Sequence, residues 1–181
     1  HCACASAQCK TPAKHPISRA APAGQNSATL DSEQIERWWA QYPKANIGIV
    51  LAPSSLVAID IDPRNGGLET IDDIEARHGP LESDVLAFTG GGGEHRVFSV
   101  PSGGAVQLPG KLGPGVDVKH NGYIVVEPSS HVSGGRYAFE ASSDPLEGAT
   151  PSPLPDWIRD LARAAPVATS VAPERVPVSE D

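Results

Sequence analysis

The sequence has no apolar run long enough to cross a membrane and no segment with the features of a secretory signal peptide. It is also poor in cysteine, and its three cysteines all fall within the first nine residues. A disulfide framework spread over the fold is therefore excluded, and the clustered cysteines favour an intracellular metal site. The apolar fraction of 39% is that of a globular protein, and 181 residues are enough for one domain with its own core.

Basic residues are scarce, and the formal net charge of −8 argues against nucleic acid as a partner. The charge is uneven, however. Residues 1–30 carry three basic residues and no acid, and residues 88–136 carry one more base than acid. Steering depends on the local field, and metal ions bound to acids reverse its sign, so this distribution is compatible with a nucleic-acid partner. The chain begins at His1 rather than methionine, which indicates a piece of a longer protein.

The N-terminal residues contain a group of soft metal ligands with the spacing Cys2-x-Cys4-x4-Cys9-x5-His15. Three thiolates and one imidazole are a complete ligand set for a tetrahedral zinc ion. The alternative is a disordered tail with incidental cysteines. We favour a structural zinc site in an N-terminal segment of residues 1–30, because protein ligands fill all four positions.

Two acids close a strongly apolar stretch at residues 56–62, which predicts a buried strand. Because side chains alternate along a strand, Asp60 and Asp62 point to the same face. Unpaired carboxylates at the end of a buried strand are costly, and a cation that prefers oxygen ligands, Mg2+ or Mn2+, removes that cost. The simpler alternative is a pair of solvated acids, because Asp-x-Asp is a common pattern.

Four consecutive glycines at residues 90–93 separate two predicted strands. Glycines let the backbone approach a ligand and expose amides to an anion, so Gly92 and Gly93 are candidate phosphate contacts. The loop matches neither the dinucleotide-binding pattern nor the phosphate loop, and a flexible hairpin loop is the alternative. His95 follows at the start of the next strand, where it is either a phosphate donor or a structural histidine.

Further strands are predicted on both sides of this loop. A short strand at residues 115–119 puts Asp117 and Lys119 on one face and valines on the other. We expect a hairpin that joins a strand at 46–51 to the Asp60 strand, and a second hairpin that joins 115–119 to 123–126.

Three helices are predicted, at residues 31–42, 68–78 and 155–165. In the first, Ile35, Trp38, Trp39 and Tyr42 form one apolar face, for which we favour core packing over stacking on a base. Leu68, Ile71 and Ile74 are expected to share the apolar side of the second helix, and Trp157, Ile158 and Leu161 to point inward from the third. Residues 31–165 should form the main domain, and the composition of residues 166–181 is typical of a linker.

Taken in order along the chain, these motifs resemble the bifunctional primase–polymerase domain of the archaeo-eukaryotic primase superfamily. That domain stands at the N-terminus of phage and plasmid replication proteins. The motifs are Asp60-x-Asp62, Gly-Gly-x-His95, Val116-Asp117-Val118, Trp38-Trp39, Asn46-Ile47-Gly48-Ile49, Gly122-Tyr123-Ile124-Val125-Val126 and the cysteine-rich start with Lys14-His15-Pro16. The sequence departs from the family at Ala13, where glycine is expected, and at Glu127, where a second proline is more usual.

The resemblance implies an α/β (α+β) core with an RRM-like mixed or antiparallel sheet flanked by helices. It implies Asp60, Asp62 and Asp117 as ligands of catalytic Mg2+ or Mn2+, and His95 as a contact to the incoming nucleotide's phosphates. Two cations about 3.5–4 Å apart suit nucleotidyl transfer, and carboxylates from two adjacent strands can hold them. Lys119 and Arg96 are further candidates for binding the triphosphate or the template.

The function expected from the resemblance is primer synthesis and extension on single-stranded DNA, with dNTPs or NTPs as substrates. The setting would be phage or plasmid replication in the cytoplasm of a bacterial host, with a helicase region in the parent protein and no membrane contact. Three alternatives remain at this point: an Asp-x-Asp glycosyltransferase, a non-catalytic single-stranded nucleic-acid-binding module, and a zinc-stabilised structural domain. The glycosyltransferase alternative leaves His95, Asp117 and the cysteines without a role.

Overall fold

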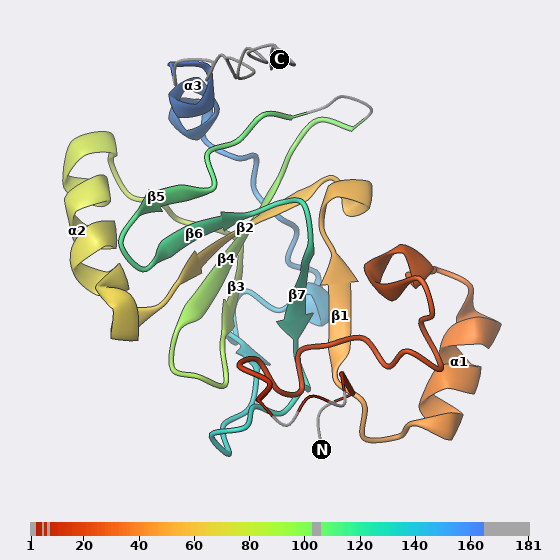
Figure 1. The fold of residues 1–181 in the computed structure, drawn as a ribbon. Coiled ribbons are helices and arrows are strands. Elements are labelled where there is room, and N and C mark those ends of the chain that lie inside the picture. The colour runs from red at the N-terminus through yellow and green to blue at the C-terminus, as the bar shows by residue number, and fades with distance from the viewer. Residues whose placement is uncertain (1–2, 5, 7, 103–105, 165–181) are drawn as a thin grey trace, which may run out of the picture.

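The computed structural model describes residues 3–4, 6, 8–102 and 106–164. Cys2 and the predicted linker at 166–181 lie outside these residues. The described part is a mixed α/β fold with three α-helices and two antiparallel sheets, as expected (Figure 1). The helices are α1 (Ser32–Gln41), α2 (Gly67–His78) and α3 (Asp156–Ala164). None of them is long and apolar enough to span a membrane.

The larger sheet has six strands in the order β5-β6-β2-β4-β3-β8, and every pairing between them is antiparallel. Its strands are β2 (Leu56–Ile61), β3 (Val85–Phe88), β4 (Glu94–Ser99), β5 (Lys111–Gly113), β6 (Val116–Lys119) and β8 (Ala138–Phe139). The smaller sheet pairs β1 (Ile47–Val50) with β7 (Tyr123–Val126). The two strands predicted on either side of the glycine loop, β3 and β4, form an antiparallel hairpin.

Both predicted hairpins are wrong, because β1 pairs with β7 and not with β2, and β7 does not pair with β6. Both edges of β2 are occupied, by β4 on one side and β6 on the other. Between β1 and β2, a short 3-10 helix at Ala52–Ser54 and the left-handed Ser55 turn the chain out of the plane of a hairpin. The two short strands thereby leave the large sheet and pair with each other.

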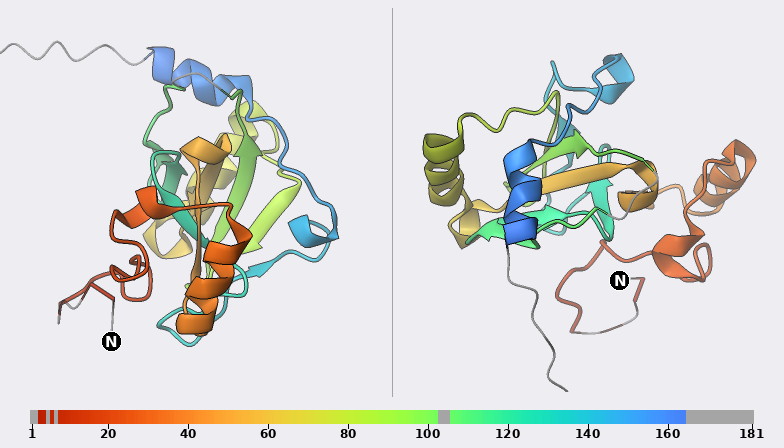
Figure 2. Two further views of the ribbon diagram at one scale, coloured as in Figure 1. Left: turned by 90° about the vertical axis from the view of Figure 1, so that its right-hand side faces the viewer. Right: turned by 90° about the horizontal axis from the view of Figure 1, so that it is seen from above.

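The two faces of the large sheet are covered by different elements (Figures 1 and 2). One face packs against α2 and α3, and its core includes Ile59, Phe98 and Ile158. On the other face, Ala58 and Val97 belong to a second apolar cluster that also contains residues of β1 and β7. The small sheet therefore covers one end of the large sheet on the face opposite to α2.

The helices form where the sequence predicts them, but they bury less than expected. The Asp31 carboxylate caps α1 by accepting hydrogen bonds from the amides of Glu33 and Gln34. No residue of α1 is buried, so the expectation that its tryptophans pack in the core is wrong. The inward placement of Leu68 and Leu161 is wrong too, because both are exposed.

Candidate active site

Asp117, Asp60 and His95 form a row across the three central strands of the large sheet. Asp60 of β2 stands directly opposite Asp117 of β6 on one side and His95 of β4 on the other. Directly opposed residues project from the same face, so the three side chains share the face that the small sheet partly covers. The sequence predicts that Asp60, Asp62 and Asp117 lie close together, and of these the pairing of β2 with β6 places Asp60 opposite Asp117.

Two lysines neutralise these acids in the structure. The Lys119 ammonium lies 2.5 Å from Asp117 Oδ2 and 3.6 Å from Asp60 Oδ2, and Lys111 Nζ lies 3.0 Å from Asp117 Oδ1. Burial disfavours the ionised form of Asp117, but the two lysines outweigh it and hold the pKa of this carboxyl below its usual range. Burial likewise opposes the charge of Lys119, yet Asp117 and Asp60 raise the pKa of this lysine. Asp117 is therefore ionised, and both acids contact basic side chains.

Asp62 lies just past the end of β2 and is engaged differently. Its carboxylate accepts hydrogen bonds from the backbone amide and the guanidinium of Arg64 and from the side chain of Asn65. The hydrogen bond from the Arg64 guanidinium is the main reason why the pKa of Asp62 is lowered. Within the described residues, Asp60, Asp62 and Asp117 do not form a group whose ligand atoms all lie within 4.8 Å of one another. The structure brings Asp62 to the same end of the sheet without closing a three-acid ligand set.

His95 is buried beside the acids, with 6% of its surface exposed. Its Nε2 lies 3.7 Å from Asp60 Oδ1, beyond hydrogen-bond distance, and its buried Nδ1 has no hydrogen-bond partner. Burial lowers the pKa of His95, and this effect together with the nearby Lys14 and Lys119 outweighs the attraction of Asp60. A neutral imidazole with an unsatisfied buried nitrogen is costly in a fold and marks a position that a ligand could complete.

The glycine loop does not present its amides as expected. The amide of Gly92 donates to the Thr89 carbonyl oxygen, and the amide of Gly93 donates to Thr89 Oγ1. A Cβ on Gly93 would lie 2.4 Å from the carbonyl oxygen of Ile61, so only glycine permits this contact with the end of β2. Gly92 and Gly93 therefore bring the loop close to the acids, but these two amides already have acceptors.

Arg96 lies on the opposite face from the acids. Its guanidinium contacts Glu75 Oε1 at 2.6 Å, Glu94 Oε1 at 2.7 Å and the Leu81 carbonyl oxygen at 2.9 Å. These contacts tie α2 to the sheet. Arg96 is therefore separated from the other predicted nucleotide contacts. This follows from its position next to His95, because neighbouring side chains in a strand point to opposite faces.

Lys14 and His131 are two basic residues near the site that the sequence analysis did not assign. The side chains of His131 and Arg64 both lie beside Gly91. A Cβ built on that glycine would lie 3.5 Å from the imidazole and 3.5 Å from the guanidinium. Burial, Lys14 and Arg64 together lower the pKa of His131. The ring of Tyr137 lies near both histidines, with its centre 6.4 Å from that of His95 and 6.3 Å from that of His131. For Lys14 a signal was present, because this residue lies in the Lys14-His15-Pro16 motif that carries the resemblance.

The N-terminal segment is fixed to the small sheet beside these residues. Asn46 Nδ2 donates to the carbonyl oxygens of Ala13 at 3.1 Å and Ser130 at 2.8 Å, and the Tyr123 hydroxyl donates to the Lys14 carbonyl oxygen at 2.6 Å. Ala13 has a φ of 63°, the left-handed conformation that favours glycine. This conformation explains why glycine is expected at this position.

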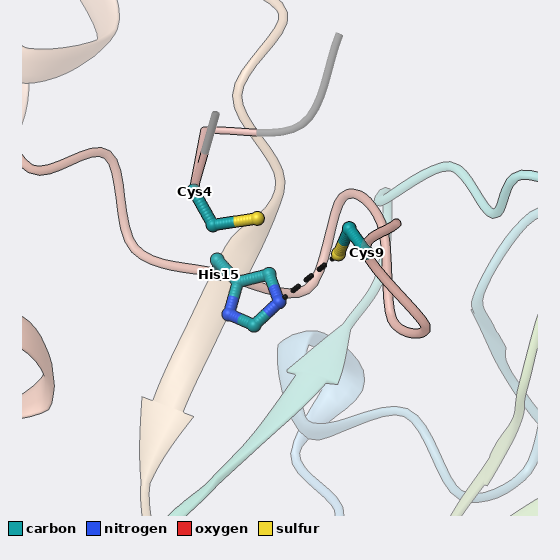
Figure 3. A group of neighbouring side chains, drawn as sticks. All are labelled: Cys4, Cys9 and His15. Atoms are coloured by element: carbon teal, nitrogen blue, oxygen red, sulfur yellow. Dashed lines mark hydrogen bonds between the residues drawn. The ribbon is translucent and has the colours of Figure 1, made fainter. Parts of the chain in front are cut away.

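Cys4, Cys9 and His15 lie together in front of β1 and β7 (Figure 3). Their ligand atoms are all within 4.8 Å of one another, and Cys9 Sγ is 3.3 Å from His15 Nε2. Ligands of a tetrahedral zinc ion with Zn–S bonds of about 2.3 Å stand about 3.8 Å apart, so this donor set fits zinc. The predicted fourth ligand, Cys2, is outside the described residues.

A family model described as the N-terminal domain of bifunctional DNA primase/polymerase matches residues 4–157. The match spans the cysteine cluster, the acid row, the glycine loop and His131. A search of curated proteins returned no match, and neither did a search of solved structures. Because the matched residues make up most of the chain, it belongs to the family of bifunctional DNA primase/polymerase N-terminal domains, whose members are nucleotidyltransferase-type enzymes that act on DNA and nucleotides with divalent metals.

Proposed function

We propose that this domain is a template-dependent nucleotidyltransferase that synthesises primers and extends them on single-stranded DNA. The observation that carries the proposal is the cross-strand row of Asp117, Asp60 and His95, in which two carboxylates lie beside a buried histidine with an unsatisfied nitrogen. Family membership supports the DNA and nucleotide substrates.

Asp60 and Asp117, with Asp62 after its release from Arg64, would hold two Mg2+ or Mn2+ ions. The donor set fits, because hard cations prefer carboxylate oxygens and the two facing acids come from adjacent strands. Bound cations would align the attacking 3′-oxygen with the leaving pyrophosphate and neutralise the charge that develops.

The protein's own basic residues would bind and orient the triphosphate. Lys119 now pairs with two acids, and its ammonium becomes available to phosphate oxygens once those acids ligate cations. Arg64 is released in the same way from Asp62, and it lies with His131 at the glycine loop. His95 would donate one hydrogen bond to a phosphate oxygen, which satisfies its buried imidazole. Positioning and charge compensation are the main protein contributions to such a transfer.

The fold supports the proposed primase-like, RRM-like core in one respect. β2 lies at the centre of the sheet, α2 follows it, and the hairpin of β3 and β4 packs back against β2. We further propose a structural zinc ion on Cys2, Cys4, Cys9 and His15, a helicase region in the parent protein, and a role in phage or plasmid replication in the bacterial cytoplasm. The ligand geometry supports the zinc ion, and the family resemblance supports the other two.

Primer synthesis is the direct test. Single-stranded DNA is incubated with labelled dNTPs or NTPs and either Mg2+ or Mn2+, and products are compared with those of the Asp60→Ala variant. New strands from the wild type alone support the proposal. DNA binding without synthesis under all these conditions would favour a non-catalytic module, and transfer from a labelled nucleotide-sugar would favour a glycosyltransferase.

A further inference from the structure

A pocket of about 330 Å³ lies between α1, the N-terminal segment and the outer face of the small sheet. Its aromatic lining consists of Trp38, Trp39 and Tyr42 from α1 and Tyr123 from β7. This is the face of β1 and β7 turned away from the large sheet, so the pocket is separate from the acid row. Its volume is at the small end of the range for ligand sites in proteins.

The local sequence keeps this pocket open. Gly48 on the floor has no side chain, and a Cβ there would lie 3.3 Å from the ring of Tyr123. Of the described residues, none from α1 belongs to either core cluster, and Trp38 and Trp39 are half-buried. In a chain with only 5% aromatic residues, four aromatic rings are therefore grouped around one cavity instead of in the core.

The charge around the pocket selects for an anion. Lys14 and Lys44 are among the described residues that line it, and no acid is among them, although the whole chain carries a net charge of −8. Flat aromatic faces with basic side chains at their edge suit a nucleobase attached to phosphate. An apolar peptide would not use the lysines.

The pocket borders the candidate active site through the N-terminal segment. Lys14 lines the pocket, and its carbonyl oxygen accepts a hydrogen bond from the Tyr123 hydroxyl. The side chain of Asn46 donates hydrogen bonds to the carbonyl oxygens of both Ala13 and Ser130, and Ser130 is the neighbour of His131. The positive charge of Lys14 also reaches His95. One extended strand of DNA can therefore contact both regions.

We propose that this pocket binds an unpaired nucleobase of the single-stranded DNA template, stacked on the aromatic residues of α1, with its phosphates on Lys14 and Lys44. The inference rests on the proposed function for the identity of the strand as template. The binding itself needs neither divalent cations nor nucleotides, so it can be measured apart from catalysis.

Tryptophan fluorescence tests the proposal without any change to the pocket. The third tryptophan, Trp157, stacks on His78 at the other face of the fold, and Trp157→Phe leaves only the two pocket tryptophans. This protein is titrated with short oligo-dT and with an abasic strand of equal length, without divalent cations. We expect oligo-dT to quench the fluorescence and the abasic strand to leave it unchanged, because stacking requires a base. The proposal would be overturned by equal quenching with both strands or by no quenching with either. It would also be overturned by a fluorescence change that depends on protein concentration, because such a change indicates that a second copy of the protein occupies the pocket.

Variants then assign the contacts. Trp39→Ala should weaken oligo-dT binding by about 5- to 150-fold, the range for loss of one stacked base. Lys44→Ala should reduce the slope of log affinity against log salt by about 0.7, the value for one phosphate contact on a single strand. Arg37→Ala is the matched control, since Arg37 lies on α1, pairs with Glu33 and does not line the pocket. An Arg37→Ala effect as large as that of Trp39→Ala would overturn the assignment to the pocket.

The two proposals fail separately. Quenching without primer synthesis would overturn the proposed function and leave a single-stranded DNA pocket. Primer synthesis without quenching would overturn the pocket assignment and leave the enzyme.

Discussion

The two groups of potential metal ligands in this domain differ in how they are held before any metal arrives. The soft donors of Cys4, Cys9 and His15 already lie within 4.8 Å of one another. The acids are instead held by basic side chains: Asp60 and Asp117 by Lys119, and Asp62 by Arg64. A preassembled soft site suits a structural ion, whereas charge-compensated acids suit ions that arrive and leave with substrate.

The difference has an electrostatic origin. Carboxylates that approach one another closely repel, so three acids cannot gather without a compensating positive charge. Basic side chains of the protein therefore neutralise the acids as long as no divalent ions are bound. Under the proposed function, the same basic side chains would then bind the phosphates of the incoming nucleotide, and metal binding would be coupled to nucleotide binding.

Removal of an acid should have the largest effect. Asp60→Ala is expected to lower primer synthesis by a factor of about 1,000 or more, because each ligand and its charge contribute several kcal/mol to the transition state. Its melting temperature should not fall, since one of two facing carboxylates is lost. Asp72→Ala, an exposed acid on α2, is the control. Full activity in Asp60→Ala would refute the catalytic assignment.

Removal of a zinc ligand should affect the site of Cys4, Cys9 and His15 and leave the acids unchanged. Purified protein is expected to contain about one zinc ion per chain by elemental analysis, and Cys9→Ala to contain almost none. Protease cleavage should then become faster near the N-terminus, because the metal no longer fixes this segment. Asp60→Ala should retain its zinc. Protein purified without any zinc would contradict the comparison.

His95→Ala should weaken nucleotide binding by about 10- to 150-fold, which corresponds to the roughly 1.5–3 kcal/mol of a hydrogen bond to a charged group. Metal and template binding should change little. The competing explanation is a purely structural histidine, in which case the variant loses thermal stability and keeps its nucleotide affinity. Calorimetric melting and dNTP titration of the same variant decide between the two.

Acidification should destabilise the domain in two separate ranges. Burial holds the pKa of His95 below 6.5, so the unfolded chain binds more protons than the folded one as the pH falls below 6.5, and stability decreases. The lowered pKa values of Asp62 and Asp117 stabilise the fold above pH 3.8 and add a second loss below that value. Urea unfolding without added Mg2+ or Mn2+ should show that His95→Ala loses less stability than wild type between pH 6.5 and 5. Equal losses would contradict the assignment to His95.

The smallest effect is expected at Ala13. Ala13→Gly should stabilise the domain by about 0.5–1 kcal/mol, since glycine removes the strain of a left-handed alanine but gives the unfolded chain more freedom. Ala28→Gly is the control, because Ala28 has an ordinary φ of −57° and should gain nothing. Chemical denaturation compares the two, and equal shifts would show that backbone strain at Ala13 is not the cause.

Much of the candidate site could be predicted because it depends on local patterns. The alternation of the strand at residues 56–62 places Asp60 and Asp62 on one face, and the spacing of Cys4, Cys9 and His15 identifies a set of soft ligands. The family was also identified from short motifs, and the match over residues 4–157 confirms it. Because side chains alternate along a strand, Arg96 must face away from its neighbour His95. The sequence alone could therefore have excluded Arg96 as a contact to the same nucleotide.

The sequence by itself determined the helices, the strand segments and the side-chain types available at each strand end, because these depend on propensities and periodicities of neighbouring residues. Only the tertiary structure decided that β1 pairs with β7, that Lys111 and Lys119 neutralise the acids, and that the α1 aromatics line a pocket instead of the core. Strand pairing and charge compensation join residues that are distant along the chain. Their energies depend on which segments compete for each edge of β2, and no local pattern records that competition.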